Sequence, residues 1–125
     1  MTMNTPAHLR YTRDDFWLDV QGEIATIGLT DFAQHELGDI VHLELPQSGA
    51  QLESGAMLGA VEAVKTVMEL RSPVAGEVVE SNVALLEDAT PINTEPYGAG
   101  WLARVKLSST PAELLSAPQY AALHP

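Results

Sequence analysis

The sequence contains no cysteine among its 125 residues. Disulfide bonds, a thiolate nucleophile and cysteine-ligated metals are therefore excluded for this chain. Histidine is sparse as well, and none of the four has a second histidine or a carboxylate at a ligand spacing, so we expect solvated side chains and no metal site. These histidines are His8, His35, His42 and His124.

Basic side chains are also scarce. The chain has six lysines and arginines and 17 aspartates and glutamates, which gives a formal net charge of −11. Phosphate binding needs clustered Lys and Arg, so a nucleic-acid partner is excluded. An acidic surface can keep a small protein soluble and monomeric and steer it towards basic partner surfaces, and a saline habitat would explain it equally well. We expect a monomer.

Long apolar runs are missing too. No segment reaches the roughly 18 residues of a membrane span, and the first 17 residues lack the apolar core of a signal peptide, so we expect a cytoplasmic protein. Hydrophobic residues make up 46% and charged residues 18% of the chain, as in ordinary globular proteins. The length predicts one domain over residues 1–125, with a loose N-terminus at 1–13.

What is present is mostly β-prone sequence bounded by turn-forming residues. A hairpin is predicted around Gln21-Gly22, and Thr30 and Gly38 are placed to begin and end a short helix over 31–37. Thr110, Pro111 and Pro118 predict two short helical pieces in a C-terminal appendage at 109–125. The predicted strands lie at 16–20, 23–30, 39–45, 56–64, 66–70, 76–82 and 100–107.

Lys65 is one of only two lysines and lies within the β-prone run GAVEAVKTVMELRSPVAGEV, residues 59–78. An uninterrupted strand there would mix polar and apolar residues on both faces, and a tight turn near Lys65 resolves the conflict. A lysine exposed at a rigid turn is a good substrate for acylation. The alternative is a solubilising charge on an edge strand.

A weak internal repeat supports the turn. The segment 38–41, Gly-Asp-Ile-Val, echoes 76–79, Gly-Glu-Val-Val. It suggests a pseudo-symmetric pair of sheets, with Lys65 at the connection between them.

The segment VEAVKTVMELRSPVAGEVVESN, residues 61–82, resembles the lipoylation segment of the glycine-cleavage H proteins. Three further blocks agree in order and spacing, so the similarity runs from about Trp17 to Leu107. They are IATIGLTDFAQ at 24–34, LGDIVHLELPQSG at 37–49 and PYGAGWLARVKL at 96–107. The resemblance implies a mainly β fold, a lipoyl-domain-like barrel-sandwich hybrid of two small sheets with a short helix near 31–37 and a C-terminal helical segment.

The same resemblance implies the site. Lys65 matches the lysine that carries lipoic acid as a covalent amide, Glu62 the acidic residue three before it and Glu69 the acidic residue four after it. Val64 and Thr66 flank the lysine, where biotin carriers have Met-Lys-Met. The redox-active sulfur atoms would then belong to the attached lipoyl group, and a protein without cysteine offers no thiolate that could trap them in a mixed disulfide.

The implied function is that of a carrier and not of an enzyme. In the family the lipoyl arm accepts an aminomethyl group from a pyridoxal-phosphate glycine decarboxylase, presents it to an aminomethyltransferase and is reoxidised by dihydrolipoyl dehydrogenase. Attachment of the arm requires a lipoate ligase or a lipoyl/octanoyl transferase. Two other hypotheses are a degenerate relative that binds a partner or passes lipoate on, and an enzyme acting through carboxylates such as Asp14, Asp15 and Asp19.

One position departs from the family. Phe16 stands where H proteins have a glutamate that helps to hold the cationic cargo, and a phenyl ring cannot pair with an ammonium group. Either Phe16 faces the arm and suits an apolar or sulfur-bearing load, or it packs while Asp14, Asp15 or Glu69 holds the amine. The first reading keeps open a lipoate-binding protein that carries sulfur beside heterodisulfide-reductase-like enzymes in bacterial sulfur oxidation.

Residues 93–101 are rich in turn formers and predict an ordered loop. Its two large aromatic residues, Tyr97 and Trp101, are expected to cover the core, with contact to a partner as the alternative.

Overall fold

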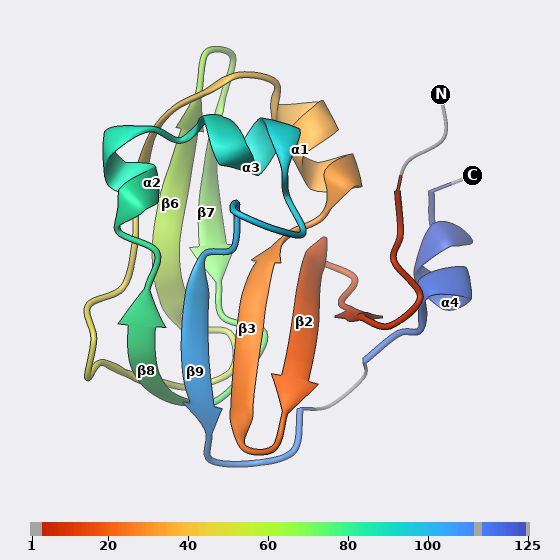
Figure 1. Ribbon diagram of the computed structural model, residues 1–125, viewed down its shortest axis with the longest axis vertical. Helices are drawn as coiled ribbons and strands as arrows, with labels where there is room; N and C mark the ends of the chain where they lie inside the picture. The colour runs from red at the N-terminus through yellow and green to blue at the C-terminus, as the bar shows by residue number, and fades with distance from the viewer. Residues whose placement is uncertain (1–3, 112–113, 125) are drawn as a thin grey trace.

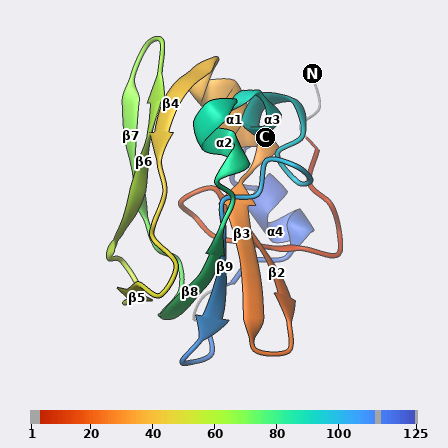
Figure 2. The same cartoon turned by 60° about the vertical axis from the view of Figure 1, so that its left-hand side comes forward.

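The computed structural model describes residues 4–111 and 114–124, which form two antiparallel β-sheets and four short helices. The large sheet has six strands in the order β1-β2-β3-β9-β8-β5, and the small sheet has three in the order β4-β6-β7. Figure 1 shows the large sheet face on, and Figure 2 shows that the small sheet forms a second layer beside it. The prediction of a mainly β fold with two sheets is confirmed. The sheets differ in size, and the two echoing segments begin strands in different sheets.

The strands of the large sheet are β1 (Arg10–Tyr11), β2 (Phe16–Gln21), β3 (Ile24–Leu29), β9 (Ala103–Leu107), β8 (Gly76–Ser81) and β5 (Gln51–Leu52). Those of the small sheet are β4 (Ile40–Glu44), β6 (Met57–Ala63) and β7 (Val67–Arg71). The helices are α1 (Asp31–Leu37), α2 (Ala84–Glu87), α3 (Thr90–Thr94) and α4 (Ala117–Ala121).

The core lies between the two sheets. Alternate side chains of each strand point inward because successive residues of a strand face opposite sides. The large sheet contributes Leu18, Ile27 and Val105, which meet Val61 and Leu70 of the small sheet in one buried cluster. Helices α1, α2 and α3 lie together at one end of the two sheets (Figure 2).

Helix α1 forms where the sequence predicts it. The hydroxyl of Thr30 accepts a hydrogen bond from the Ala33 amide at 3.2 Å, which satisfies one of the free amides of the first turn. Gly38 ends the helix with φ of 73°, a value that glycine adopts without a steric penalty. These two residues fix both ends of the helix.

The predicted loose N-terminus at 1–13 is wrong for its described part, residues 4–13. β1 pairs with β2, and Leu9 and Tyr11 are buried. These side chains join Trp17 and Tyr120 in a second buried cluster, on the other side of the large sheet from the main core. The N-terminal segment is ordered because it supplies apolar cover for that face.

The predicted C-terminal appendage contains one helix in its described part instead of two. Leu115 is extended and exchanges two backbone hydrogen bonds with Tyr11, of 2.7 and 2.9 Å, so the chain is not helical there. Helix α4 begins after Ser116, whose side chain and that of Gln119 form a capping box. Residues 112–113 of the predicted first helical piece lie outside the described residues. Pro118 lies in the first turn of α4 and does not separate two helices.

Helices α2 and α3 and the short strand β5 were not predicted. The residues that precede the two helices, Val83 and Ala89, make no capping hydrogen bond with their side chains. For α3 the sequence does carry a start signal that was missed, because Pro91 lies in the first turn and the Asp88 carboxylate accepts a hydrogen bond from the Thr90 amide at 3.0 Å. Helix α3 takes the first residues of the predicted loop at 93–101. Among the residues that the structure describes, no helix is long and apolar enough to cross a membrane.

Candidate functional site

Lys65 lies at the tip of the hairpin formed by β6 and β7. Glu62 of β6 pairs with Val67 of β7, and the amide of Ala63 donates to the carbonyl of Thr66 at 2.8 Å. Val64 and Lys65 are therefore the two residues of the loop. The hairpin tip projects beyond the three helices at that end of the molecule (Figure 1). The tight turn predicted at Lys65 is confirmed.

A contact with the neighbouring strand holds this turn in place. The amide of Val64 donates a hydrogen bond of 3.2 Å to the carbonyl of Asp39, just before β4. Neither Val64 nor Lys65 has a positive φ, so the loop is neither of the two turn types that require glycine or asparagine. The turn thus accepts two bulky residues, and two strands fix its backbone.

The amine of Lys65 is free. The side chain is exposed, and within residues 4–111 and 114–124 no carboxylate lies within ion-pair distance of it. Glu62 is also exposed, whereas Glu69 pairs with Arg71 at 2.9 Å on the solvent side of β7. Because Lys65 lies outside both strands, the edge-strand role does not apply. The lysine is presented to solvent without a structural role in the hairpin.

The other lysine has a different setting. Lys106 lies within β9, flanked by β3 and β8, and its amine is 4.0 Å from the carboxylate of Glu23. An acylating enzyme would have to approach it across the face of the large sheet. The fold therefore distinguishes the two lysines by position.

Phe16 does not lie on the surface. Its side chain is 1% exposed and belongs to the main core, and its backbone pairs with Leu29 in the large sheet. Of the two readings of this position, packing is the one that the geometry supports. A contact between this ring and an arm on Lys65 would require the core to open.

The two aspartates that precede Phe16 have different surroundings. The carboxylate of Asp15 accepts a hydrogen bond of 2.8 Å from the Tyr120 hydroxyl and contacts His124 at 3.0 Å. Asp14 is exposed and lines a surface pocket of 310 Å³ together with Arg13 and Arg71. Asp15 is thus engaged by the C-terminal helix, and Asp14 is available near the Glu69–Arg71 pair.

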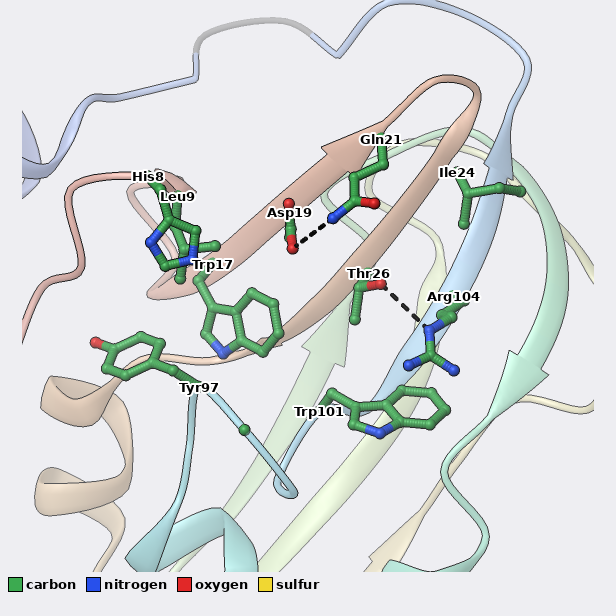
Figure 3. Close-up of a pocket in the computed structure, with 11 residues that line it drawn as sticks. His8, Leu9, Trp17, Asp19, Gln21, Ile24, Thr26, Tyr97, Trp101 and Arg104 are labelled. Atoms are coloured by element: carbon green, nitrogen blue, oxygen red, sulfur yellow. Dashed lines mark hydrogen bonds between the residues drawn. The ribbon is translucent and has the colours of Figure 1, made fainter.

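A second and larger pocket, of 480 Å³, lies on the outer face of the large sheet and does not include Lys65 (Figure 3). The indole of Trp17 lies over Gly28, where an added Cβ would come within 2.6 Å of it, and donates to the Pro96 carbonyl at 2.8 Å. Tyr97 and Trp101 are half-buried and pack on the second cluster, so they cover that outer face and not the main core. Arg104 stacks on Trp101 at 4.0 Å.

Two features of the small sheet were not found from the sequence. One is the Glu69–Arg71 ion pair, which the two-residue spacing on one strand face could have indicated. The other is a β-bulge in β4, which turns Val41 outward beside the tip. No local sequence pattern marks this bulge. The described residues contain no group of three or more side chains that could hold a metal ion.

Comparisons with known proteins agree with this geometry. The family model described as "Glycine cleavage H-protein" matches residues 9–124. A glycine cleavage system H protein of Rubrobacter xylanophilus is 49% identical over 93% of this chain and 91% of its own length. One of Geobacillus kaustophilus is 48% identical over 97% of each chain.

The similarity extends to structure. A crystal structure of a glycine cleavage system H protein from Mycobacterium marinum superposes with a TM-score of 0.89 at 39% identity and covers 94% of this chain and 97% of its own. None of these relatives supports the sulfur-carrier alternative. The match of sequence, fold and nearly complete length shows that this chain belongs to the glycine cleavage H-protein family.

Proposed function

We propose that Lys65 carries the lipoyl group of this protein. Glycine cleavage H proteins are carriers, not enzymes, and hold lipoate covalently on a lysine. The observation that supports Lys65 is its position as an exposed, unpaired amine at a two-residue hairpin loop within the described chain. An acylating enzyme can reach this amine without disturbing the fold.

Attachment of the group is an acyl transfer. The Lys65 amine attacks the activated carboxyl carbon, an amide bond forms, one proton leaves the nitrogen, and AMP or a carrier thiol leaves the acyl group. We propose a lipoate ligase or a lipoyl/octanoyl transferase as the enzyme. Glu62, Val64 and Thr66 surround the amine on the exposed hairpin and would be covered during this step.

The chain is a lipoyl-carrying shuttle of the glycine cleavage system, whose enzymes are the decarboxylase, the aminomethyltransferase and the lipoamide dehydrogenase. The lipoyl dithiol supplies the redox and group-carrying chemistry, and the protein supplies its position.

We further propose that Glu69 and Asp14, and not Phe16, face the cargo end of the arm. Glu69 lies four residues from Lys65 along β7, roughly 13 Å at the rise of a strand, which is comparable to the length of an extended lipoyl-lysine. Asp14 lines the pocket beside Arg71, the partner of Glu69. Both carboxylates are exposed, whereas Phe16 is buried.

Intact-mass measurement tests the attachment site. The protein, incubated with lipoate, ATP and a lipoate ligase, should gain one lipoyl group, and Lys65→Arg should gain none. Because Lys65 is exposed and unpaired, Lys65→Arg should change the free energy of unfolding by less than about 0.5 kcal/mol. Lys106→Arg is the matched control and should be modified like the unaltered protein. Modification of Lys65→Arg, or none of the unaltered protein, would refute the assignment.

We also propose that the chain forms one carrier domain and acts as a monomer in the cytoplasm. Size-exclusion chromatography with light scattering tests the monomer.

A further inference from the structure

Three exposed valines surround the hairpin tip. Val41, Val64 and Val67 are 58%, 70% and 63% exposed, and we call them the valine collar. None of them belongs to either buried cluster or packs against one as a partly buried side chain. The fold therefore does not need their apolar surface for its own core. Three of the nine large apolar side chains that the described residues expose thus lie at this one tip, a concentration that is typical of contact sites.

The backbone places the three valines on different sides of the loop. Val67 lies directly opposite Glu62 in the β6–β7 pairing, and Val64 is in the loop itself. Val41 is the bulged residue of β4, between the pairs Ile40–Ala63 and His42–Glu62. The collar thus has one member on each outer strand of the small sheet and one at the tip.

The collar is rigid before anything binds. Its turn is closed by the Ala63–Thr66 hydrogen bond and tied to β4 by the Val64–Asp39 hydrogen bond. Valine has few side-chain rotamers because its Cβ is branched. Because the loop and the valine side chains are already ordered, they lose little conformational entropy when a partner binds, and this favours association.

Position determines which partner must cover the collar. An enzyme that acylates Lys65 has to bring its reacting carbonyl carbon to the amine of the loop and so encloses Val64. Enzymes that use the finished arm act at its far end. Of the exposed carboxylates of the small sheet, Glu62 lies directly opposite Val67 of the collar. Glu44 and Glu69 lie farther from the tip, both opposite Ala60. Their charge favours a partner with an apolar pocket and a basic rim.

We propose that the valine collar is the apolar anchor by which the lipoylating enzyme recognises this protein. The inference rests on the assignment of Lys65 as the attachment site and adds a recognition surface to it. The acyl transfer is the one described above, and the collar takes no part in its bond changes. It increases the affinity of the enzyme for the acceptor protein.

The test compares the unlipoylated protein with the triple variant Val41→Thr, Val64→Thr, Val67→Thr. Threonine keeps the shape and the β-branching of valine and replaces one methyl group by a hydroxyl. Val20→Thr is the control, because Val20 is 40% exposed on β2, near the β2–β3 turn at the opposite end of the molecule (Figure 1). Rates of lipoylation by a lipoate ligase are followed by intact mass at varied acceptor concentration.

We expect the KM for the triple variant to rise by up to about sixtyfold, since each of the three methyl groups withdrawn from the contact contributes about fourfold. Its kcat should stay close to that of the unaltered protein, and the Val20→Thr control should match that protein in both constants. Thermal unfolding of each variant shows that the fold is kept, and the single variant Val67→Thr serves if the triple variant is unstable.

An unchanged KM in the folded triple variant, or an equal rise in the control, would refute the role of the collar in enzyme recognition. The assignment of Lys65 as the attachment site would not be affected by that result. Absence of any lipoyl adduct on the unaltered protein would instead refute the proposed function, and the collar with it.

Discussion

The ring of Phe16, at the start of β2 in the large sheet, is part of the main core. Its side chain is 1% exposed, and a buried carboxylate without a partner is strongly unfavourable. Phenylalanine avoids that cost. Packing in the core therefore accounts for the phenyl ring at this residue in this chain.

A substitution measures this packing. Phe16→Ala should lower the free energy of unfolding by about 3–5 kcal/mol, because it removes a buried aromatic side chain and leaves a cavity. Urea denaturation followed by circular dichroism gives the value. Val20→Ala, at a partly exposed position of the same strand, should lower it much less. A loss below about 1 kcal/mol for Phe16→Ala would mean that the ring is not packed in solution.

At the scale of elements, the position of β4 against β6 decides how the hairpin tip is held. A Cβ added at Gly59 of β6 would overlap the backbone carbonyl oxygen of Glu44 in β4. Glycine is needed there because the two backbones approach closely. The same strand pair contains the bulge at Val41 and the contact from Asp39 to the turn.

Gly59→Ala should therefore displace β4 and loosen the tip. We expect a loss of about 2 kcal/mol or more in the free energy of unfolding, since neither backbone can yield easily. Amide hydrogen exchange should rise at Val64, whose hydrogen bond to Asp39 depends on β4. Gly49→Ala is the control, because its added Cβ would meet nothing within 4 Å and only its φ of 90° would be strained. Equal exchange at Val64 in both variants would contradict the bracing role.

At the scale of the whole molecule, the two ends of the described chain are joined on the outer face of the large sheet. The rings of Tyr11 and Tyr120 stack at 4.9 Å, and the Tyr120 hydroxyl bonds to Thr30 at 2.7 Å and to Asp15 at 2.8 Å. The ring of His124 stacks on Phe32 at 3.6 Å. This set of contacts holds α4 and the N-terminal segment to one another and to α1.

Burial in this region affects the ionisation of three tyrosines. It raises the pKa of Tyr97 to about 12, and it raises the pKa of Tyr11 and of Tyr120 as well, with the neighbouring Asp15 adding to the effect at Tyr120. The unfolded chain has tyrosine pKa values near 10. Above that pH the unfolded state releases protons that the folded state retains, so the stability falls as the pH rises.

We therefore expect the free energy of unfolding to be steady up to about pH 10 and to decrease between about pH 10 and 12. Urea denaturation at fixed ionic strength from pH 8 to 12 measures it, with tyrosinate absorbance as a second probe. Tyr120→Phe should reduce the decrease of stability with pH, since one titrating group is lost. It should also lower the free energy of unfolding at pH 8 by about 1–3 kcal/mol, because Thr30 and Asp15 lose their hydrogen-bond partner. A stability that does not change above pH 10 would contradict the burial of these hydroxyls.

Local sequence signals were sufficient for much of the fold and for the presentation of the site. Thr30 and Gly38 fix the ends of α1, and the conflict of polarity around Lys65 is resolved by a turn at that residue. Such signals act between residues that are close in the chain, where capping, turn preference and alternation apply directly. The exposure of one amine at the tip of a β-hairpin followed from them.

Contacts between distant segments decided the rest. The Asp15–His124 contact joins residues 109 positions apart, and the pairing of Tyr11 with Leu115 replaces a predicted helix by an extended segment. The burial of Phe16 and the outward position of Val41 depend on which strands come together. The sequence by itself determined the seven longer strands, the helix α1 and the lysine at the turn, because near neighbours set them, whereas β1 and β5 were not predicted. Only the tertiary structure decided which side chains are buried and which surround the lysine, because packing between sheets selects them.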